Sequence, residues 1–180
     1  VGIIDKYFPS TDFFTEFERF ERHLDKLKRK SLAIDYVSVC SPNYLHDSHS
    51  RFALGIGADV VCEKPLALNP RNLDGLRELE LKTGRKVFSI LQLRLHPAIQ
   101  RLYEKIQGSP SSKVSDVDLT SITSREKWYY ASRTGVAAKS GGIATNIAIH
   151  FFVMMSWLFG PLQKSLVHLQ THDRSAGSFV

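Results

Sequence analysis

The sequence predicts an α/β fold, in which an incomplete, doubly wound parallel sheet is followed by part of an α+β domain with a mostly antiparallel sheet. The first observation is that short β-branched apolar runs alternate with amphipathic helical segments up to about residue 95. The second is a change of pattern beyond residue 96, where a Ser- and Pro-rich linker leads to segments that alternate polar and apolar residues. We therefore expect two domains, 1–95 and 96–180.

The first expected helix begins at a capping box, Thr15-Glu-Phe-Glu18, and runs to about Lys28. The run Ile34–Cys40 is short, apolar and β-branched, and it is stopped by Ser41-Pro42-Asn43, which predicts a buried parallel strand. A second helix is expected from about Tyr44 to Ile56, with glycines at its end.

The next strand is predicted at Asp59–Cys62. A third helix opens at Asn69-Pro70, because Asn is a good N-cap and proline suits the first turn, and it stops at Gly84. Lys86–Leu93 is the last strand of this half. Repeated strand and helix segments of this kind build a sheet whose ligands bind beyond the carboxyl ends of the strands.

The second half is predicted to contain a helix at Ala98–Gln107 and, after the linker, a half-exposed strand at Val114–Thr123. A long helix follows from about Ile143 to Phe159, and Leu162–Leu169 alternates again as a strand. The longest apolar run of the sequence, around Phe151–Phe159, is shorter than the ~20 residues that cross a bilayer, so no membrane span is predicted.

Charge and cysteine usage narrow the class of protein. Lys and Arg outnumber Asp and Glu by 24 to 18, which favours either nucleic acid or an anionic small molecule as ligand. No aromatic residues interleave with the densest basic run, residues 26–30, so we predict no nucleic-acid partner. Cys40 and Cys62 both lie in or at the ends of predicted strands, which indicates structural thiols in a cytoplasmic protein. His46 and His49 have no further ligands at metal-site spacing, so no metal is expected.

Two segments carry candidate chemistry. The first places Lys64 and Pro65 directly after a buried strand. The second, Ser140-Gly-Gly-Ile-Ala-Thr-Asn146-Ile-Ala-Ile-His150, opens a helix and sets Asn146 and His150 on one face. Together they predict a site that moves a proton beside a cofactor. Either Lys64 or His150 can act as the base, and we favour His150, with Lys64 as the donor to the reacting oxygen.

These segments, with Ser41-Pro42-Asn43, Glu63-Lys64-Pro65 and Gly141-Gly142, resemble the glucose-fructose oxidoreductase and inositol dehydrogenase family of nicotinamide-dependent sugar oxidoreductases. The resemblance implies that residues 1–95 are the C-terminal part of a dinucleotide-binding Rossmann domain and that residues 96–180 begin the α+β substrate and oligomerisation domain. It implies NAD as cofactor and Lys64 and His150 as catalytic residues. The cofactor-binding residues implied are Ser41, Pro42, Asn43, His46, Glu63, Lys64 and Gln92.

The stretches Cys40-Ser-Pro-Asn-Tyr-Leu-His46, Leu91-Gln-Leu-Arg-Leu-His-Pro97 and Gly142-Ile-Ala-Thr-Asn146 resemble, more narrowly, family members that oxidise the 3-hydroxyl of UDP-N-acetylglucosaminuronic acid in bacterial surface polysaccharide biosynthesis. This implies a UDP-sugar substrate, cofactor recycling by 2-oxoglutarate and a homo-oligomer. The substrate-binding candidates, suited to uronate, pyrophosphate and uridine, are Asn146, Arg94, His96, Arg125, Trp128 and Tyr129.

The sequence departs from the family in several places. It contains no Gly-x-Gly-x-x-Gly turn, so we expect Val1 to follow the second strand of the domain, the chain to be an internal piece, and the choice between NAD and NADP to stay open. Ala148 and Val153 stand where relatives place glycine and aspartate. A catalytically silent binding module and a dehydrogenase of another sugar or cyclitol therefore remain alternatives.

Overall fold

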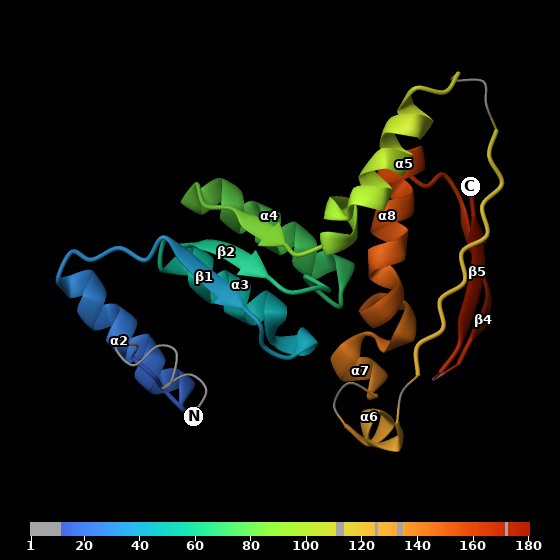
Figure 1. Ribbon diagram of the computed structural model, residues 1–180. Coiled ribbons are helices and arrows are strands. Elements are labelled where there is room, and N and C mark those ends of the chain that lie inside the picture. The colour runs from blue at the N-terminus through green and yellow to red at the C-terminus, as the bar shows by residue number, and fades with distance from the viewer. Residues whose placement is uncertain (1–11, 111–113, 125, 133–134, 172) are drawn as a thin grey trace. The chain divides into compact units, whose positions relative to one another are not determined.

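The computed structural model describes residues 12–180 except 111–113, 125, 133–134 and 172, and it divides into two units, residues 1–35 and 36–180. The first unit contains α2 (Phe17–Arg29; Figure 1). It is an amphipathic helix in which Leu24 is buried. The predicted capping box is wrong, because Glu16 is the N-cap residue and no side chain caps the helix. The reason is that Glu18 accepts a hydrogen bond from Arg22, one turn along the helix, instead of reaching back to the N-terminus.

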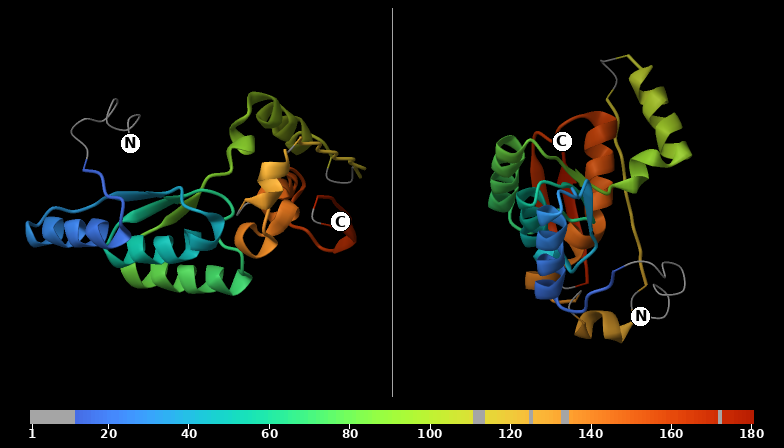
Figure 2. Two further views of the ribbon diagram at one scale, coloured as in Figure 1. Left: turned by 90° about the horizontal axis from the view of Figure 1, so that it is seen from below. Right: turned by 90° about the vertical axis from the view of Figure 1, so that its left-hand side faces the viewer.

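The second unit begins with a parallel sheet of β1 (Tyr36–Val39), β2 (Asp59–Cys62) and β3 (Val87–Ser89), in that order. Val39 is opposite Cys62, and Cys62 is opposite Ser89, so the three strands end level with one another. Helices α3 (His46–Gly55) and α4 (Pro70–Thr83) connect them and lie on the same face of the sheet (Figure 2, left). The predicted alternation of parallel strands and helices is confirmed.

The core of this sheet lies between the strands and the two helices. Its buried members are Val39, Ala53, Leu54, Val60, Cys62 and Leu76. Asn69 caps α4 by accepting from the backbone N–H of Arg71 at 3.0 Å, and Gly84 ends the helix with φ 70°. Both ends of α4 are therefore as the sequence predicted. Fully burying an aliphatic side chain such as Leu54 stabilises the folded state by about 1.5–3 kcal/mol relative to leaving it exposed.

Beyond β3 the chain forms a short 3₁₀ turn, η2 (Gln92–Leu95), and then α5 (Pro97–Gln107). The strand predicted at Val114–Thr123 is wrong, because residues 114–124 form no sheet in the part of the chain that the structure describes. The alternation is present, but a strand also needs a hydrogen-bonded neighbour, and none of the described residues pairs with this segment.

The remaining elements are α6 (Lys127–Ala131), α7 (Ala137–Ser140), a π-helical turn η3 (Ala144–Ala148), α8 (Ile149–Phe159) and the strands β4 (Ser165–Gln170) and β5 (Ser175–Phe179). β4 and β5 form an antiparallel hairpin with a register shift between Val167 and Leu169. The strand expected at Leu162–Leu169 is confirmed in shifted form as β4, whereas β5 was not predicted.

The helical segment Ala137–Phe159 is 23 residues long and, by length and composition alone, apolar enough to cross a membrane. Its backbone is interrupted by left-handed glycines at 141 and 142 and by the π turn. Its last turns bury Met154, Met155 and Leu158 against α5 and η2. Trp157 stacks on Tyr103 of α5 at a centroid distance of 4.2 Å. The last turns therefore pack against the rest of the domain, whereas only 11% of the segment's apolar window is buried in the structure.

Candidate active site

Lys64 meets Asn146 across 82 positions of sequence. Lys64 follows β2, and the Lys64–Pro65 peptide bond is cis. Its ammonium group donates to the backbone carbonyl of Asn146 and to Oδ1 of the same residue at 3.3 Å. The end of the parallel sheet and the π turn before α8 are thus joined by one cation. π-helical turns occur frequently at functional sites.

The side chain of Asn146 has two further partners. Its Oδ1 accepts from Nδ2 of Asn43 at 3.1 Å, and its Nδ2 donates to the hydroxyl of Tyr129 at 3.2 Å. Asn43 follows β1, whereas Tyr129 lies on α6. Asn146 is therefore the point at which the sheet edge, α6 and the π turn meet.

Asn43 also holds the segment in front of the π turn, because its Nδ2 donates to the carbonyl of Ser140 at 2.9 Å. Ser140 is 2% exposed, and its hydroxyl accepts from the backbone N–H of Gly142 at 3.1 Å. The sequence did not mark Ser140 as a functional residue. Its position before two glycines was the available signal, since Ser hydroxyls often satisfy turn backbones.

Position 141 requires glycine, both because of its backbone conformation and because of the side chains around it. Its φ is 86°, and a Cβ at this position would lie 2.8 Å from Cβ of Thr145 and 2.9 Å from Cδ2 of Leu68. A side chain here would push the π turn away from the loop after β2. The Gly-Gly pair thus allows Asn146 to approach Lys64.

His150 lies on α8, one helical turn after Asn146, and is partly buried. Its Nδ1 is shielded from solvent and has no hydrogen-bond partner among the residues that the structure describes. Burial first, and then the nearby Lys64 charge, lower the pKa of His150 from its ordinary 6.5, while Glu63 acts in the opposite direction. The ring is therefore neutral at pH 7, as a general base must be.

His46 ties the two loops of the sheet edge together. It is 1% exposed, and its Nδ1 and Nε2 each lie 2.7 Å from a backbone carbonyl oxygen, of Pro65 and Ser41 respectively. One carbonyl belongs to the turn that carries Lys64 and the other to the loop after β1. The imidazole consequently fixes the spacing between these loops and is too deeply buried to be a surface ligand.

His49, one turn further along α3, also contacts this loop. Its Nδ1 lies 3.0 Å from the hydroxyl oxygen of Ser41. Burial and then the charge of His46 lower the pKa of His49. In the sequence, His49 stood out only as a rejected metal ligand. Its place on the same helix face as His46 was the signal that it reaches the same loop.

The other predicted site residues lie at different levels of exposure. Pro42 and Glu63 are partly buried beside Asn43 and Lys64, and the Glu63 carboxylate accepts from the backbone N–H of Lys64 at 3.3 Å. Gln92 and Arg94, on η2, are exposed. So is His96, whose Nδ1 accepts from the backbone N–H of Ala98 and caps α5.

Of the aromatic candidates, Tyr129 contacts Asn146, and Trp128 is 64% exposed with its ring edge-on to Tyr129 at 6.3 Å. Arg125 lies outside the described residues. The structure thus brings Lys64, Asn43, Asn146 and Tyr129 into one network, whereas Gln92, Arg94, His96 and Trp128 are not joined to it by any hydrogen bond found between described residues.

Two other features contribute no chemistry to this site. Burial raises the pKa of the Cys62 thiol to about 11, so it stays protonated and unreactive. No group of three or more His, Cys, Asp or Glu side chains among the described residues is arranged to hold a metal ion.

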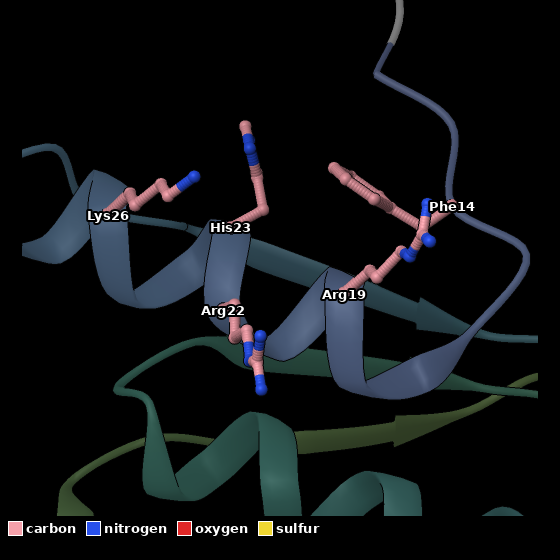
Figure 3. A pocket seen from close by; sticks show the side chains of 5 residues that line it. All are labelled: Phe14, Arg19, Arg22, His23 and Lys26. Carbon is pink, nitrogen blue, oxygen red and sulfur yellow. The ribbon is translucent and has the colours of Figure 1, made fainter.

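A pocket also lies on the first unit, against α2 (Figure 3). It is lined by Phe14, Arg19, Arg22, His23 and Lys26. Arg19, Arg22 and His23 pair with Glu16, Glu18 and Asp12, which are exposed surface carboxylates. Such exposed pairs belong to a solvated helix face and do not build a ligand site.

The site at the sheet edge fits part of a dinucleotide. Ligands of doubly wound sheets bind beyond the carboxyl ends of the strands, and Ser41, Asn43 and Lys64 all follow such ends. The shielded, unpartnered Nδ1 of His150 is the kind of atom that a bound polar group satisfies. The loop residues would hold the cofactor, with the helix residues available to the substrate.

Comparison with solved structures gives the same fold over the whole chain. The WlbA (WbpB) dehydrogenase from Thermus thermophilus, in complex with NAD and alpha-ketoglutarate, is 46% identical, with a TM-score of 0.94 over 100% of this chain and 58% of that one. A WlbA (WbpB) structure from the same organism with NAD and UDP-GlcNAcA is 42% identical, with a TM-score of 0.90 and the same coverage.

Among curated proteins, D-glucoside 3-dehydrogenase from Escherichia coli (strain K12) is 27% identical over 133 residues, which is 73% of this chain and 38% of that protein. The chain thus spans less than two thirds of the length of these relatives, 38% of the curated protein and 58% of the solved structure.

Two family models match the sequence. The model described as "Oxidoreductase family, NAD-binding Rossmann fold" matches residues 1–90, and the one described as "Oxidoreductase family, C-terminal alpha/beta domain" matches residues 113–179. The predicted fold class and the NAD-binding character of the first half are confirmed, while the boundary at residue 95 stays a prediction. The chain belongs to the Gfo/Idh/MocA oxidoreductase family.

Proposed function

We propose that the full-length protein containing this chain is a cytoplasmic, NAD-dependent dehydrogenase. Its proposed reaction is oxidation of the 3-hydroxyl of UDP-N-acetylglucosaminuronic acid in bacterial surface polysaccharide biosynthesis. The observation that carries the proposal is the joining of Lys64 to Asn146, one helical turn before a partly buried His150 with a lowered pKa. The similarity to WlbA structures that contain NAD and UDP-GlcNAcA supports this choice of ligands.

The chain's own residues divide the chemistry between a base and a hydrogen-bond donor. When bound, NAD⁺ supplies the acceptor for the hydride that leaves C3 of the sugar. His150 takes the hydroxyl proton, because its lowered pKa leaves the ring neutral at pH 7. The Lys64 ammonium donates to the same oxygen and stabilises its developing negative charge. In the reverse assignment, Lys64 takes the proton and His150 orients the hydroxyl.

The remaining candidates would bind the rest of the substrate. Trp128 offers an exposed aromatic face for uridine, and Arg94 and Arg125 match carboxylate and pyrophosphate. We also propose that 2-oxoglutarate recycles the reduced cofactor and that the full-length protein is a homo-oligomer. The alpha-ketoglutarate in one WlbA structure supports the recycling step.

The test is formation of NADH by the purified full-length protein. We expect kcat/KM with UDP-N-acetylglucosaminuronic acid to exceed that with UDP-N-acetylglucosamine by at least ~10²-fold, because an arginine paired with the carboxylate would lose its partner. Methyl glucoside and myo-inositol test the alternative that another sugar or cyclitol is the substrate.

Equal or higher kcat/KM with either of these compounds would replace the uronate as substrate. Binding of NADH without turnover of any of these compounds would support the silent binding module, for which Ala148 in the π turn and Val153 in α8 are the candidate causes.

A further inference from the structure

Asn146 uses most of its hydrogen-bonding capacity within the protein. A side-chain amide oxygen has two lone pairs, and both are engaged here, by Lys64 at 3.3 Å and by Asn43 at 3.1 Å. One of the two N–H groups donates to Tyr129 at 3.2 Å. At most one N–H remains for a ligand. The side chain therefore serves mainly to hold other protein groups, and substrate binding is at best its secondary role.

The two oxygens that Asn146 offers to Lys64 are both uncharged. They orient the ammonium group but do not neutralise it. A carboxylate of the same shape at this position would accept from Lys64 and Asn43 equally well, and the Tyr129 hydroxyl could donate to it instead. The network would thus tolerate either group, and the difference between them is one negative charge beside Lys64.

That charge matters because Lys64 acts electrostatically on His150. After burial, the positive charge of Lys64 is the second cause of the lowered pKa of His150, and Glu63 opposes it. The elements packed against α8 bring other charged groups, but these are exposed to solvent: Arg94 on η2 and Arg101, Glu104 and Lys105 on α5. Screening by water makes them weaker than the two groups in the site.

We propose that Asn146 is a positioning residue whose neutral amide holds Lys64 in place while leaving its positive charge to act on His150 and on the substrate oxygen. Asn146 thereby keeps His150 in the unprotonated state that proton removal requires. This proposal rests on the proposed function for its catalytic meaning, but its electrostatic content concerns only residues of this chain.

The test compares three variants of the full-length protein. Asn146→Asp adds a carboxylate of nearly the same shape beside Lys64. Asn69→Asp is the matched control, because it adds the same charge at an exposed N-cap where Asp caps a helix as well as Asn does. Lys64→Met removes the charge on which the proposal depends and provides a second test if Asn146→Asp does not fold.

The first readout is the titration midpoint of the His150 imidazole, followed by NMR in the protein without substrate. We expect Asn146→Asp to raise it by about one pH unit, since an opposite charge within ~4–6 Å favours the protonated ring. Lys64→Met should raise it as well, because it removes a like charge, and Asn69→Asp should leave it unchanged. The acid limb of kcat/KM should move in the same direction, so that at a pH below the wild-type midpoint Asn146→Asp loses about tenfold in rate.

The proposal is overturned if neither Asn146→Asp nor Lys64→Met moves the His150 midpoint relative to wild type and Asn69→Asp. It is also overturned if Asn146→Asp lowers kcat equally at all pH values with an unmoved midpoint, since that result indicates a purely structural role. The proposed function fails separately, if the wild-type protein does not oxidise UDP-N-acetylglucosaminuronic acid although the midpoints move as expected.

Discussion

Asn43 and Asn146 are 103 positions apart in the sequence, yet Nδ2 of one lies 3.1 Å from Oδ1 of the other. Their contact joins the loop after β1 to the π turn that precedes His150. Lys64 completes the junction from the neighbouring loop after β2. Because both loops start at the level end of the parallel sheet, the sheet register determines whether the junction can form.

Replacing His150 by glutamine should reduce kcat by ~10²-fold to 10⁴-fold if this ring is the base. Proton removal is needed only on the way to the transition state, so the Kd for NADH should change little. Steady-state turnover and fluorescence titration of NADH measure the two quantities. An unchanged kcat, with chemistry shown to be rate-limiting, would assign the proton to Lys64 instead.

The pH profile gives a second check on His150 in the wild-type protein. Its pKa is lowered from 6.5, so the neutral form that a base requires should predominate at and above that pH. We expect kcat/KM to be level in pH around neutrality and to fall only on the acid side, below 6.5. A limb that instead rises through pH 8 to 10 would indicate deprotonation of a lysine as the required step.

Replacing Lys64 by methionine should also lower kcat strongly, since the chain length is kept while the charge and its donors are lost. The double variant with His150→Gln should lose much less than the product of the two single losses, because both groups act on one hydroxyl. The values of kcat for the wild-type protein, the two single variants and the double variant give the coupling free energy between the two residues. Multiplicative losses would show that the residues act on different steps.

The sequence was sufficient to predict the parallel half of the fold, and the structure shows why. The ends of α4 depend on Asn69 and Gly84, whose effects are local, and β1 and β2 contribute the buried apolar residues Val39, Val60 and Cys62 to the core. The same local reasoning placed Lys64 and Asn43 at strand ends, where the topology brings them together. The sequence alone therefore predicts these two members of the candidate site.

Other features depend on partners that local patterns do not reveal. The segment 114–124 alternates like a strand but pairs with nothing among the described residues, whereas β5 is rich in small polar residues and pairs with β4. The π turn requires one extra residue per turn, which leaves little trace in periodicity. The roles of Asn146 and His46 arise from contacts with distant loops, so the sequence could only mark them as candidates.

Replacing Gly141 by alanine should destabilise the protein and the site. A left-handed φ costs a non-glycine residue about 1–3 kcal/mol, and the added Cβ would clash with Thr145 and Leu68. Gly84→Ala is the matched control, since Gly84 also has a positive φ but open space around its Cβ position. Urea denaturation should show a larger loss for Gly141→Ala, together with a reduced kcat. Equal losses in the two variants would mean that the π turn relaxes without strain.

Replacing His46 by leucine should loosen both loops of the site. The ring is 1% exposed and lies 2.7 Å from the carbonyl oxygens of both Ser41 and Pro65. Leaving a buried carbonyl without a donor costs about 1–3 kcal/mol, and a neutral imidazole donates from only one of its two nitrogens, so the replacement should reduce the free energy of unfolding by at least ~1 kcal/mol.

The matched control is His49→Leu, the same change one turn further along α3. His49 is less buried and contacts the hydroxyl of Ser41, which can rotate to another partner, so its replacement should cost less stability than that of His46. His46→Leu should also raise the KM for NAD and lower kcat, because Ser41 and Lys64 lie on the loops that the ring connects. Urea denaturation and steady-state kinetics at pH 7.5 measure these effects, a pH that also avoids protonating the lowered-pKa ring of His49. If both variants lost equal stability and kept wild-type kinetics, His46 would be an ordinary buried residue, and the spacing of the two loops would have to come from the sheet alone.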